Sequence, residues 1–174
     1  MPRRVKHNER RPKMKNLEQA ACSMAAIYAR TASAKNGSAD RLAEQIRKVK
    51  SGLPPDLASK NVEVYAEIGS GTLGFEKDRD DNVRPELQRL ANDVRRGRVG
   101  SVHVADRRKL AHSLGVLWRF TKLCGDHGVT VFAGDREVGC LAGLSENAHL
   151  ASMAEAVADL CDEFHHRACL LRRR

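Results

Sequence analysis

The chain has 174 residues, 41% of them hydrophobic but only 4% aromatic, which suffices for one domain with a core of alanine, valine, leucine and isoleucine, plus an arm or tail. No apolar run approaches the roughly 20 residues that span a membrane, and the start of the chain is too polar for a signal peptide. Thirty-one lysines and arginines outnumber 22 acidic residues, and this formal net charge of +9 indicates a polyanionic partner, most often nucleic acid.

The first sixteen residues predict a flexible basic arm. They contain two prolines, no apolar period, and seven basic side chains against Glu9 alone, a net charge of +6. A solvated tail without a function is the alternative interpretation. The basic residues of the arm are Arg3, Arg4, Lys6, Arg10, Arg11, Lys13 and Lys15.

Short apolar strands and amphipathic helices alternate after the arm. Residues 25–30 form an apolar run that predicts a strand. Ser38 is the expected N-cap of a helix that extends to Gly52, because apolar residues recur at helical spacing between them. Residues 62–66 alternate and include β-branched side chains, which predicts a second strand.

The same alternation continues through the middle of the chain. Arg84 and Pro85 open a well-marked helix with proline at its first position and leucines on one face. Residues 102–105 predict a third strand, followed by a basic turn and a helix over residues 111–125, and residues 129–133 predict a fourth strand. This order predicts an α/β fold: a mostly parallel sheet of about four to five strands with helices on both faces.

A long C-terminal helix is expected from about residue 145. We therefore predict a basic arm over residues 1–16, an α/β domain over 17–143, and a helix over 144–174 that ends in three arginines. The apolar stripe of this helix either packs on its own domain or meets a second copy, and its length favours a homodimer formed through residues 145–172. The stripe consists of Leu150, Met153, Ala154, Val157, Cys161, Phe164, Ala168 and Leu171.

A glycine-rich loop follows the second predicted strand. Residues 69–74 match the pattern GxGxxG, but a dinucleotide site requires these glycines to open a helix, and the charged residues 75–82 follow instead. The acidic side chains of this stretch are more typical of a solvated loop than of a metal site. The seven histidines show no ligand spacing. We expect no metal and no cofactor.

Five scattered cysteines without a CxxC pair predict reduced thiols in a cytosolic protein. The expected location is therefore cytoplasmic, at the nucleoid if the protein is bound to DNA.

Four motifs occur in order along the chain. The first predicted strand ends in Tyr28-Ala29-Arg30, and Gln45 lies in the helix that follows. Glu67-Ile68-Gly69-Ser70-Gly71 comes after the second strand, and the next helix opens with Arg84-Pro85-Glu86-Leu87-Gln88-Arg89-Leu90. In their order and spacing these motifs resemble the catalytic domain of the serine recombinases, the resolvase and invertase family, over about residues 25–172.

This resemblance implies a chemistry that needs neither metal nor cofactor. In that family a serine hydroxyl attacks a DNA phosphodiester and forms a phosphoserine link, while arginines stabilise the charge on the phosphoryl oxygens through bidentate hydrogen bonds. The resemblance assigns Arg30, Ser70 and Arg84 to such a site.

The position of the nucleophile departs from the family pattern. With Arg30 aligned, this position holds Ala32, which has no hydroxyl group. Ser33 reaches it only through a slip of one residue, which also turns the side chain to the other face of a strand.

The second departure lies where the family has Arg-Leu-x-Arg. Matching its leucine to Leu110 puts Lys109 and His112 in the two arginine places. Lysine lacks the planar fork of arginine, and histidine is mostly neutral at pH 7. We therefore predict that Arg30, Arg84, Lys109 and His112 are remnants of a phosphate-binding cluster.

The sequence thus predicts a catalytically inactive serine-recombinase homologue, an accessory or regulatory subunit that binds DNA, an active recombinase or another partner. One alternative is an active, atypical recombinase that uses Ser33; another is a protein-interaction module that does not bind DNA. The family's helix-turn-helix does not follow the long helix in this sequence, so phosphate contacts with little sequence reading are expected. The predicted DNA-binding residues are Arg3, Arg4, Arg10, Arg11, Lys13, Lys15, Arg107, Arg108, Arg172, Arg173 and Arg174.

Overall fold

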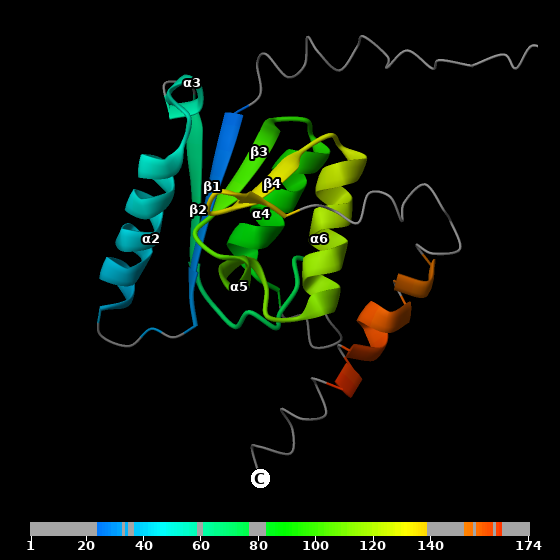
Figure 1. Ribbon diagram of the computed structural model, residues 1–174. Coiled ribbons are helices and arrows are strands. Elements are labelled where there is room, and N and C mark those ends of the chain that lie inside the picture. Colours follow the sequence, from blue (N-terminus) through cyan, green and yellow to red (C-terminus); the bar gives the residue numbers. More distant parts are fainter. Residues whose placement is uncertain are drawn as a thin grey trace, which may run out of the picture.

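The structure is a computed structural model that describes residues 24–32, 34, 37–58, 61–76, 83–138, 152–154, 156–161 and 163–164. Within these residues, five strands form one sheet in the order β2-β1-β3-β4-β5 (Figure 1). Strands β1 to β4 run parallel, and β5 is antiparallel to β4. The strands are β1 (Met24–Thr31), β2 (Val62–Ile68), β3 (Val99–Val104), β4 (Thr130–Ala133) and β5 (Arg136–Glu137).

Helices lie on both faces of this sheet, which confirms the predicted α/β fold. Figure 1 shows α2 on one side of the strands and α4 and α6 on the other. Helix α5 contacts β1 and β3 and follows the carboxyl end of β3. The helices are α2 (Ser38–Gly52), α3 (Pro55–Ala58), α4 (Pro85–Arg95), α5 (Arg107–Leu110) and α6 (Leu114–Asp126).

The main core lies between the sheet and helices α4 and α6. The expectation of a purely aliphatic core is wrong, because Tyr28, Tyr65, Phe75 and Phe120 are all buried. The rings of Phe75 and Phe120 meet edge to face, with centroids 5.7 Å apart. The few aromatic residues are concentrated in the core because each of them buries a large apolar area there.

Several element boundaries differ from the predictions for local reasons. Gly37, at φ 79°, precedes α2, so that Ser38 is the first helical residue rather than the N-cap. Helix α6 begins at Leu114, later than predicted, because the Ser113 hydroxyl accepts a hydrogen bond from the backbone N–H of Val116 (3.1 Å) and caps the helix. The predicted basic turn forms the one-turn helix α5.

The C-terminal helix is described only in part. Residues 152–154, 156–161 and 163–164 are helical, and Asp159 forms an ion pair of 2.8 Å with Arg119 of α6. Ala158 is buried. Four apolar side chains of these residues are more than half exposed: Met153, Val157, Leu160 and Phe164. The other residues of the predicted helix over 144–174, and the predicted arm over 1–16, lie outside the described residues.

None of the helices in the described part of the chain is both long and apolar enough to cross a membrane.

Candidate phosphate-binding site

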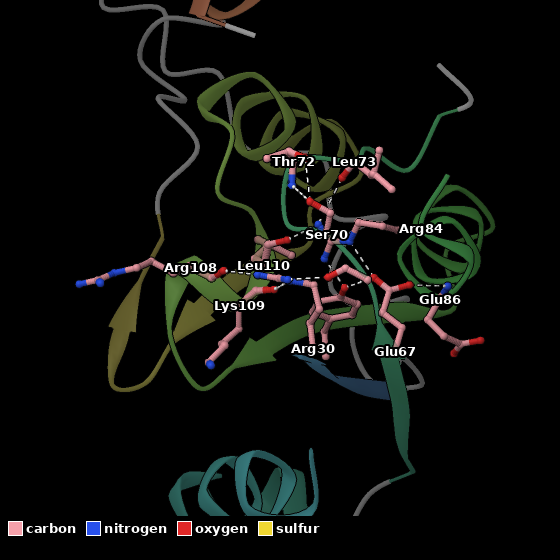
Figure 2. Close-up of polar contacts among 12 residues, drawn as sticks. Arg30, Glu67, Ser70, Thr72, Leu73, Arg84, Glu86, Arg108, Lys109 and Leu110 are labelled. Atoms are coloured by element: carbon pink, nitrogen blue, oxygen red, sulfur yellow. Dashed lines mark hydrogen bonds and ion pairs between the residues drawn. The ribbon is translucent and has the colours of Figure 1, made fainter. Parts of the chain in front are cut away.

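Three of the four motifs meet at the carboxyl end of β1. Tyr28 and Arg30 come from β1, Glu67 from the neighbouring end of β2, and Arg84 from the residue just before α4. Figure 2 shows the side chains of Arg30, Glu67 and Arg84 close to one another and to the backbone of α5. The parallel pairing of β1 with β2 sets Arg30 opposite Glu67, which places motifs 37 residues apart in the sequence side by side.

Glu67 is the acceptor at the centre of a buried network. Its Oε1 accepts hydrogen bonds from Nε of Arg84 (2.7 Å) and from the hydroxyl of Tyr28. Its Oε2 accepts one from the backbone N–H of Glu86 (3.0 Å) in the first turn of α4. Because Glu67 and Arg84 are 6% and 1% exposed, this ion pair is shielded from water and depends on these hydrogen bonds.

Tyr28 joins the two charged groups as a neutral hydroxyl. It donates to Glu67 and accepts from Nη2 of Arg84, whose guanidinium also lies 5.3 Å from the Tyr28 ring centroid. Burial raises the pKa of the Tyr28 hydroxyl, and the positive charge of Arg84 opposes this effect only in part. Tyr28 therefore keeps its proton and orients the ion pair.

Arg30 is 2% exposed, and its guanidinium donates to three backbone carbonyls. Nη1 donates to Gly69 (2.7 Å), Nη2 to Arg108 (3.0 Å) and Nε to Lys109 (3.0 Å). Burial lowers the pKa of Arg30, and the nearby positive charge of Arg84 lowers it further. Arginine nevertheless stays protonated in proteins, so the side chain keeps its charge. Its charge is therefore compensated by carbonyl oxygens.

Gln45 of α2 completes the hydrogen bonding of the Arg30 backbone. Strand β3 pairs with β1 only as far as Tyr28, so the backbone of Arg30 extends beyond its neighbour on that side. The Gln45 side chain accepts from the Arg30 N–H (3.4 Å) and donates to the Arg30 carbonyl (3.2 Å). The glutamine side chain thus provides the hydrogen bonds to the Arg30 backbone that a neighbouring strand would otherwise make.

The two buried arginines together cap α5. The last carbonyls of a helix lack intrahelical partners and carry a partial negative charge. Arg30 binds those of Arg108 and Lys109, and Nη1 of Arg84 binds that of Leu110 (2.6 Å) and, more weakly, that of Leu73 (3.4 Å). The conformation of α5 thus depends on guanidinium groups from two other elements.

The basic side chains of α5 face outward, whereas Leu110 is buried in the core. Arg107 and Arg108 are exposed and Lys109 is half-buried. Figure 2 shows the side chains of Arg108 and Lys109 pointing away from the Arg30 guanidinium, although their carbonyls bind it. Cationic groups therefore occur in two layers, one beneath the α5 backbone and one on its outer side.

Three further predicted site residues are described by the structure, namely Ser70, His112 and Ala32. Ser70 is exposed, and its hydroxyl is 2.8 Å from that of Thr72 and accepts from the Thr72 N–H (3.3 Å). His112 is exposed, and its backbone N–H donates to the Gly71 carbonyl (2.8 Å). Ala32 is exposed just past the end of β1. Ser33, the basic residues of the arm and Arg172, Arg173 and Arg174 lie outside the described residues.

Comparison with known proteins identifies the family of this domain. The family model described as "Resolvase, N terminal domain" matches residues 25–171. The chain belongs to the resolvase family. This membership associates it with serine recombinases and DNA recombination in general.

Solved structures support the same fold for this resolvase-family domain. The N-terminal catalytic domain of TP901-1 integrase is 18% identical, with a TM-score of 0.52 over 84% of this chain and 98% of that one. A resolvase family site-specific recombinase from Streptococcus pneumoniae is 16% identical, with a TM-score of 0.54 over 87% and 99%. The C-terminal catalytic domain of ISC1926 TnpA, an IS607-like serine recombinase, is 20% identical, with a TM-score of 0.51 over 79% and 97%. No curated protein sequence matches the chain.

Glu67, Tyr28 and Gln45 belong to the site of this resolvase-family domain but were not among its predicted site residues. The sequence could have identified these three residues, because each lies in or beside a segment that resembles the family. It could not have identified the partners of Arg30, because they are backbone carbonyls. Within the described residues, no group of three or more histidine, cysteine, aspartate or glutamate side chains is arranged to hold a metal.

Proposed function

We propose that this protein is a catalytically inactive serine-recombinase homologue that binds DNA through phosphate contacts and acts as an accessory or regulatory subunit. The observation that carries this proposal is Ala32, exposed past the end of β1, two residues after Arg30. A methyl group cannot attack phosphorus, so a site aligned in this way forms no phosphoserine link.

The directions of the arginine donors support the absence of catalysis. Catalysis by arginine requires N–H groups aimed at the oxygens of the transition state. In this protein one donor on each of the three nitrogens of Arg30 points to a carbonyl, and all three nitrogens of Arg84 bind protein oxygens. The two arginines therefore stabilise α5 and the Glu67 network, and leave few donors for a substrate.

The outer side of α5 supports DNA binding. Arg107 and Arg108 are exposed, and neither forms an ion pair within the described residues. Exposed guanidinium groups suit phosphate oxygens, which accept bidentate hydrogen bonds. Contacts of this kind carry little sequence information, which fits a subunit that relies on a partner for targeting.

The exposed apolar face of the C-terminal helical residues supports a homodimer. Met153, Val157, Leu160 and Phe164 are spaced at three and four residues and each is more than half exposed. One helix face of this kind, opposite the side that contacts Arg119 of α6, is typical of a helix that packs against a second copy.

A covalent-adduct assay tests the catalytic part of the proposal. The protein is incubated with a nicked duplex that would trap a phosphoserine link, and the products are resolved under denaturing conditions. We expect no adduct from the unaltered chain. An adduct that disappears in Ser33→Ala would overturn the proposal and establish the alternative, an active recombinase that uses Ser33.

A DNA titration tests the binding part. Affinity for duplex DNA is measured at two salt concentrations for the full chain and for a chain without residues 1–16. We expect binding that weakens steeply with salt, because phosphate contacts release counterions, and that weakens further on deletion. If the full chain shows no salt-sensitive binding, the second alternative, a protein-interaction module, takes the place of this proposal.

A further inference from the structure

The backbone of Gly71 lies directly against two side chains of the candidate site. A Cβ atom at this position would be 2.2 Å from Cδ2 of His112, 2.6 Å from Nη2 of Arg30 and 2.9 Å from Cζ of Arg30. Ordinary contacts of a Cβ begin near 3.4 Å. Gly71 is buried, and glycine is the residue that permits so close an approach of the backbone.

Hydrogen bonds hold this segment in place at three points. The Gly69 N–H donates to the Thr31 carbonyl (2.9 Å), which ties the start of the loop to the end of β1. The Gly69 carbonyl accepts from Nη1 of Arg30 (2.7 Å), and the Gly71 carbonyl accepts from the backbone N–H of His112 (2.8 Å). The segment thus lies across the guanidinium group and is joined to the chain on either side of it.

The two neighbours of Gly71 differ in exposure, because His112 is exposed and Arg30 is buried. The Arg30 guanidinium keeps two hydrogen bonds to α5, through Nε to Lys109 and Nη2 to Arg108. A side chain added at Gly71 therefore displaces the Gly69–Gly71 segment rather than Arg30.

We propose that the Gly69–Gly71 segment is a lid over Arg30, latched by the backbone N–H of His112, and that an anionic group reaches Arg30 only after this segment lifts. Lifting breaks the bond of Nη1 to Gly69 and uncovers Nη2, while the two bonds to α5 keep the guanidinium in position. A guanidinium has five N–H donors, so with two of them bound to α5 three are left for an anion in the open form. The anion expected there, the phosphate of DNA, rests on the proposed function, whereas the lid does not.

Chemical modification of arginine tests the lid without DNA. The full chain is treated with phenylglyoxal, and the modified arginines are mapped by mass spectrometry. In the unaltered protein we expect Arg30 to react at least about tenfold more slowly than exposed Arg107, because it reacts only from the open form. Gly71→Ala is expected to remove most of this difference. The control is Gly74→Ala in the same loop, where a Cβ meets no atom closer than 3.7 Å.

Hydrogen exchange gives a second measure that does not depend on a variant. In the unaltered protein the amide of His112 is expected to exchange through the same opening that exposes Arg30, and faster than the amides of β1. In Gly71→Ala this exchange is expected to accelerate while that of β1 is unchanged. Equal reactivity of Arg30 and Arg107 in the unaltered protein, or slow exchange of His112 together with β1, would overturn the lid.

Inorganic phosphate distinguishes this proposal from the proposed function. If the lid closes a phosphate site, phosphate is expected to protect Arg30 from phenylglyoxal in Gly71→Ala more than in the unaltered protein. Arg30 that becomes reactive in Gly71→Ala but is not protected by phosphate overturns the anion site and leaves DNA binding through α5 intact. If instead the protein does not bind DNA but Arg30 still reacts slowly and becomes reactive in Gly71→Ala, the proposed function is overturned and the lid stands.

Discussion

Two layers of cationic side chains lie on opposite sides of α5, and they differ in what their charges bind. Beneath the helix, Arg30 and Arg84 are 2% and 1% exposed and donate to carbonyls and to Glu67. On its outer side, Arg107 and Arg108 are exposed. The same residue type therefore holds the fold together in one layer and is available to a ligand in the other.

The difference follows from solvation. A buried guanidinium loses its water and must have every strong partner supplied by the protein, which uses the donors that a substrate would need. An exposed one keeps its water and can exchange it for phosphate oxygens. If this comparison is correct, substitutions beneath α5 change stability, and those on its outer side change DNA binding.

Arg84→Met is expected to have the largest effect. The substitution leaves the Glu67 carboxylate buried without its ion-pair partner, at a cost of about 3–5 kcal/mol in the free energy of unfolding. Urea denaturation measures this loss. The control is Arg89→Met, because Arg89 pairs with Glu63 and Glu86 at the surface and should contribute no more than about 1 kcal/mol. Equal losses for the two variants would contradict a special role for the buried pair.

Arg30→Met is expected to have the next largest effect. The carbonyls of Gly69, Arg108 and Lys109 lose their donor, and with some access to water the cost is about 2–3 kcal/mol. Hydrogen exchange should locate the loosening in α5 and at His112 rather than in β4. If stability is unchanged and only DNA binding is lost, Arg30 contacts DNA rather than stabilising the fold, and the two groups of arginines do not differ in the proposed way.

His103 is a buried side chain that, unlike the two buried arginines, can lose its charge by giving up a proton. It is 8% exposed, stacks on Phe132, and Nε2 lies 2.9 Å from the Ser101 hydroxyl. Burial lowers the pKa of His103 below its usual 6.5. The unfolded chain therefore binds this proton more readily, so stability is full above about pH 6.5 and decreases as the pH falls through that value toward the folded pKa.

Unfolding by urea at several pH values measures this dependence, which should be smaller than either arginine effect. His103→Asn is expected to flatten this pH dependence. A slope that persists in His103→Asn would assign the effect to another group.

The double variant Arg107→Ala/Arg108→Ala should have the smallest effect on stability, within about 0.5 kcal/mol. Its effect appears in DNA binding, where the loss of two phosphate contacts reduces the slope of log affinity against log salt by about 2. Lys122→Ala together with Arg47→Ala, which removes two positive charges elsewhere, is the matched control. An unchanged salt slope would remove α5 from the DNA contact.

Much of the fold was predictable from local patterns in the chain. Apolar runs at residues 25–30 and 129–133 and the helix that opens at Pro85 lie within a few residues of their predicted limits, because periodicity and helix-capping residues act locally. Strand β5 was missed, since Arg136 and Glu137 are two exposed polar residues with no strand pattern.

The motifs that meet at the candidate site could be recognised in the sequence, whereas their contacts could not. The order of Tyr28-Ala29-Arg30, Glu67 and Arg84 along the chain was sufficient to suggest the family, because motif spacing is a property of the sequence. The sequence of these motifs did not predict that Arg30 and Arg84 cap α5, since the acceptors are backbone carbonyls, which every residue has.

The amino-acid sequence therefore established an α/β domain of the resolvase family, with alanine at residue 32. The direction of each guanidinium and the approach of Gly71 to Arg30 depend on how distant segments pack together. The pairing of β1 with β2 and β3 brings those segments to one end of the sheet, and that long-range pairing assigns one arginine to the fold and another to the surface.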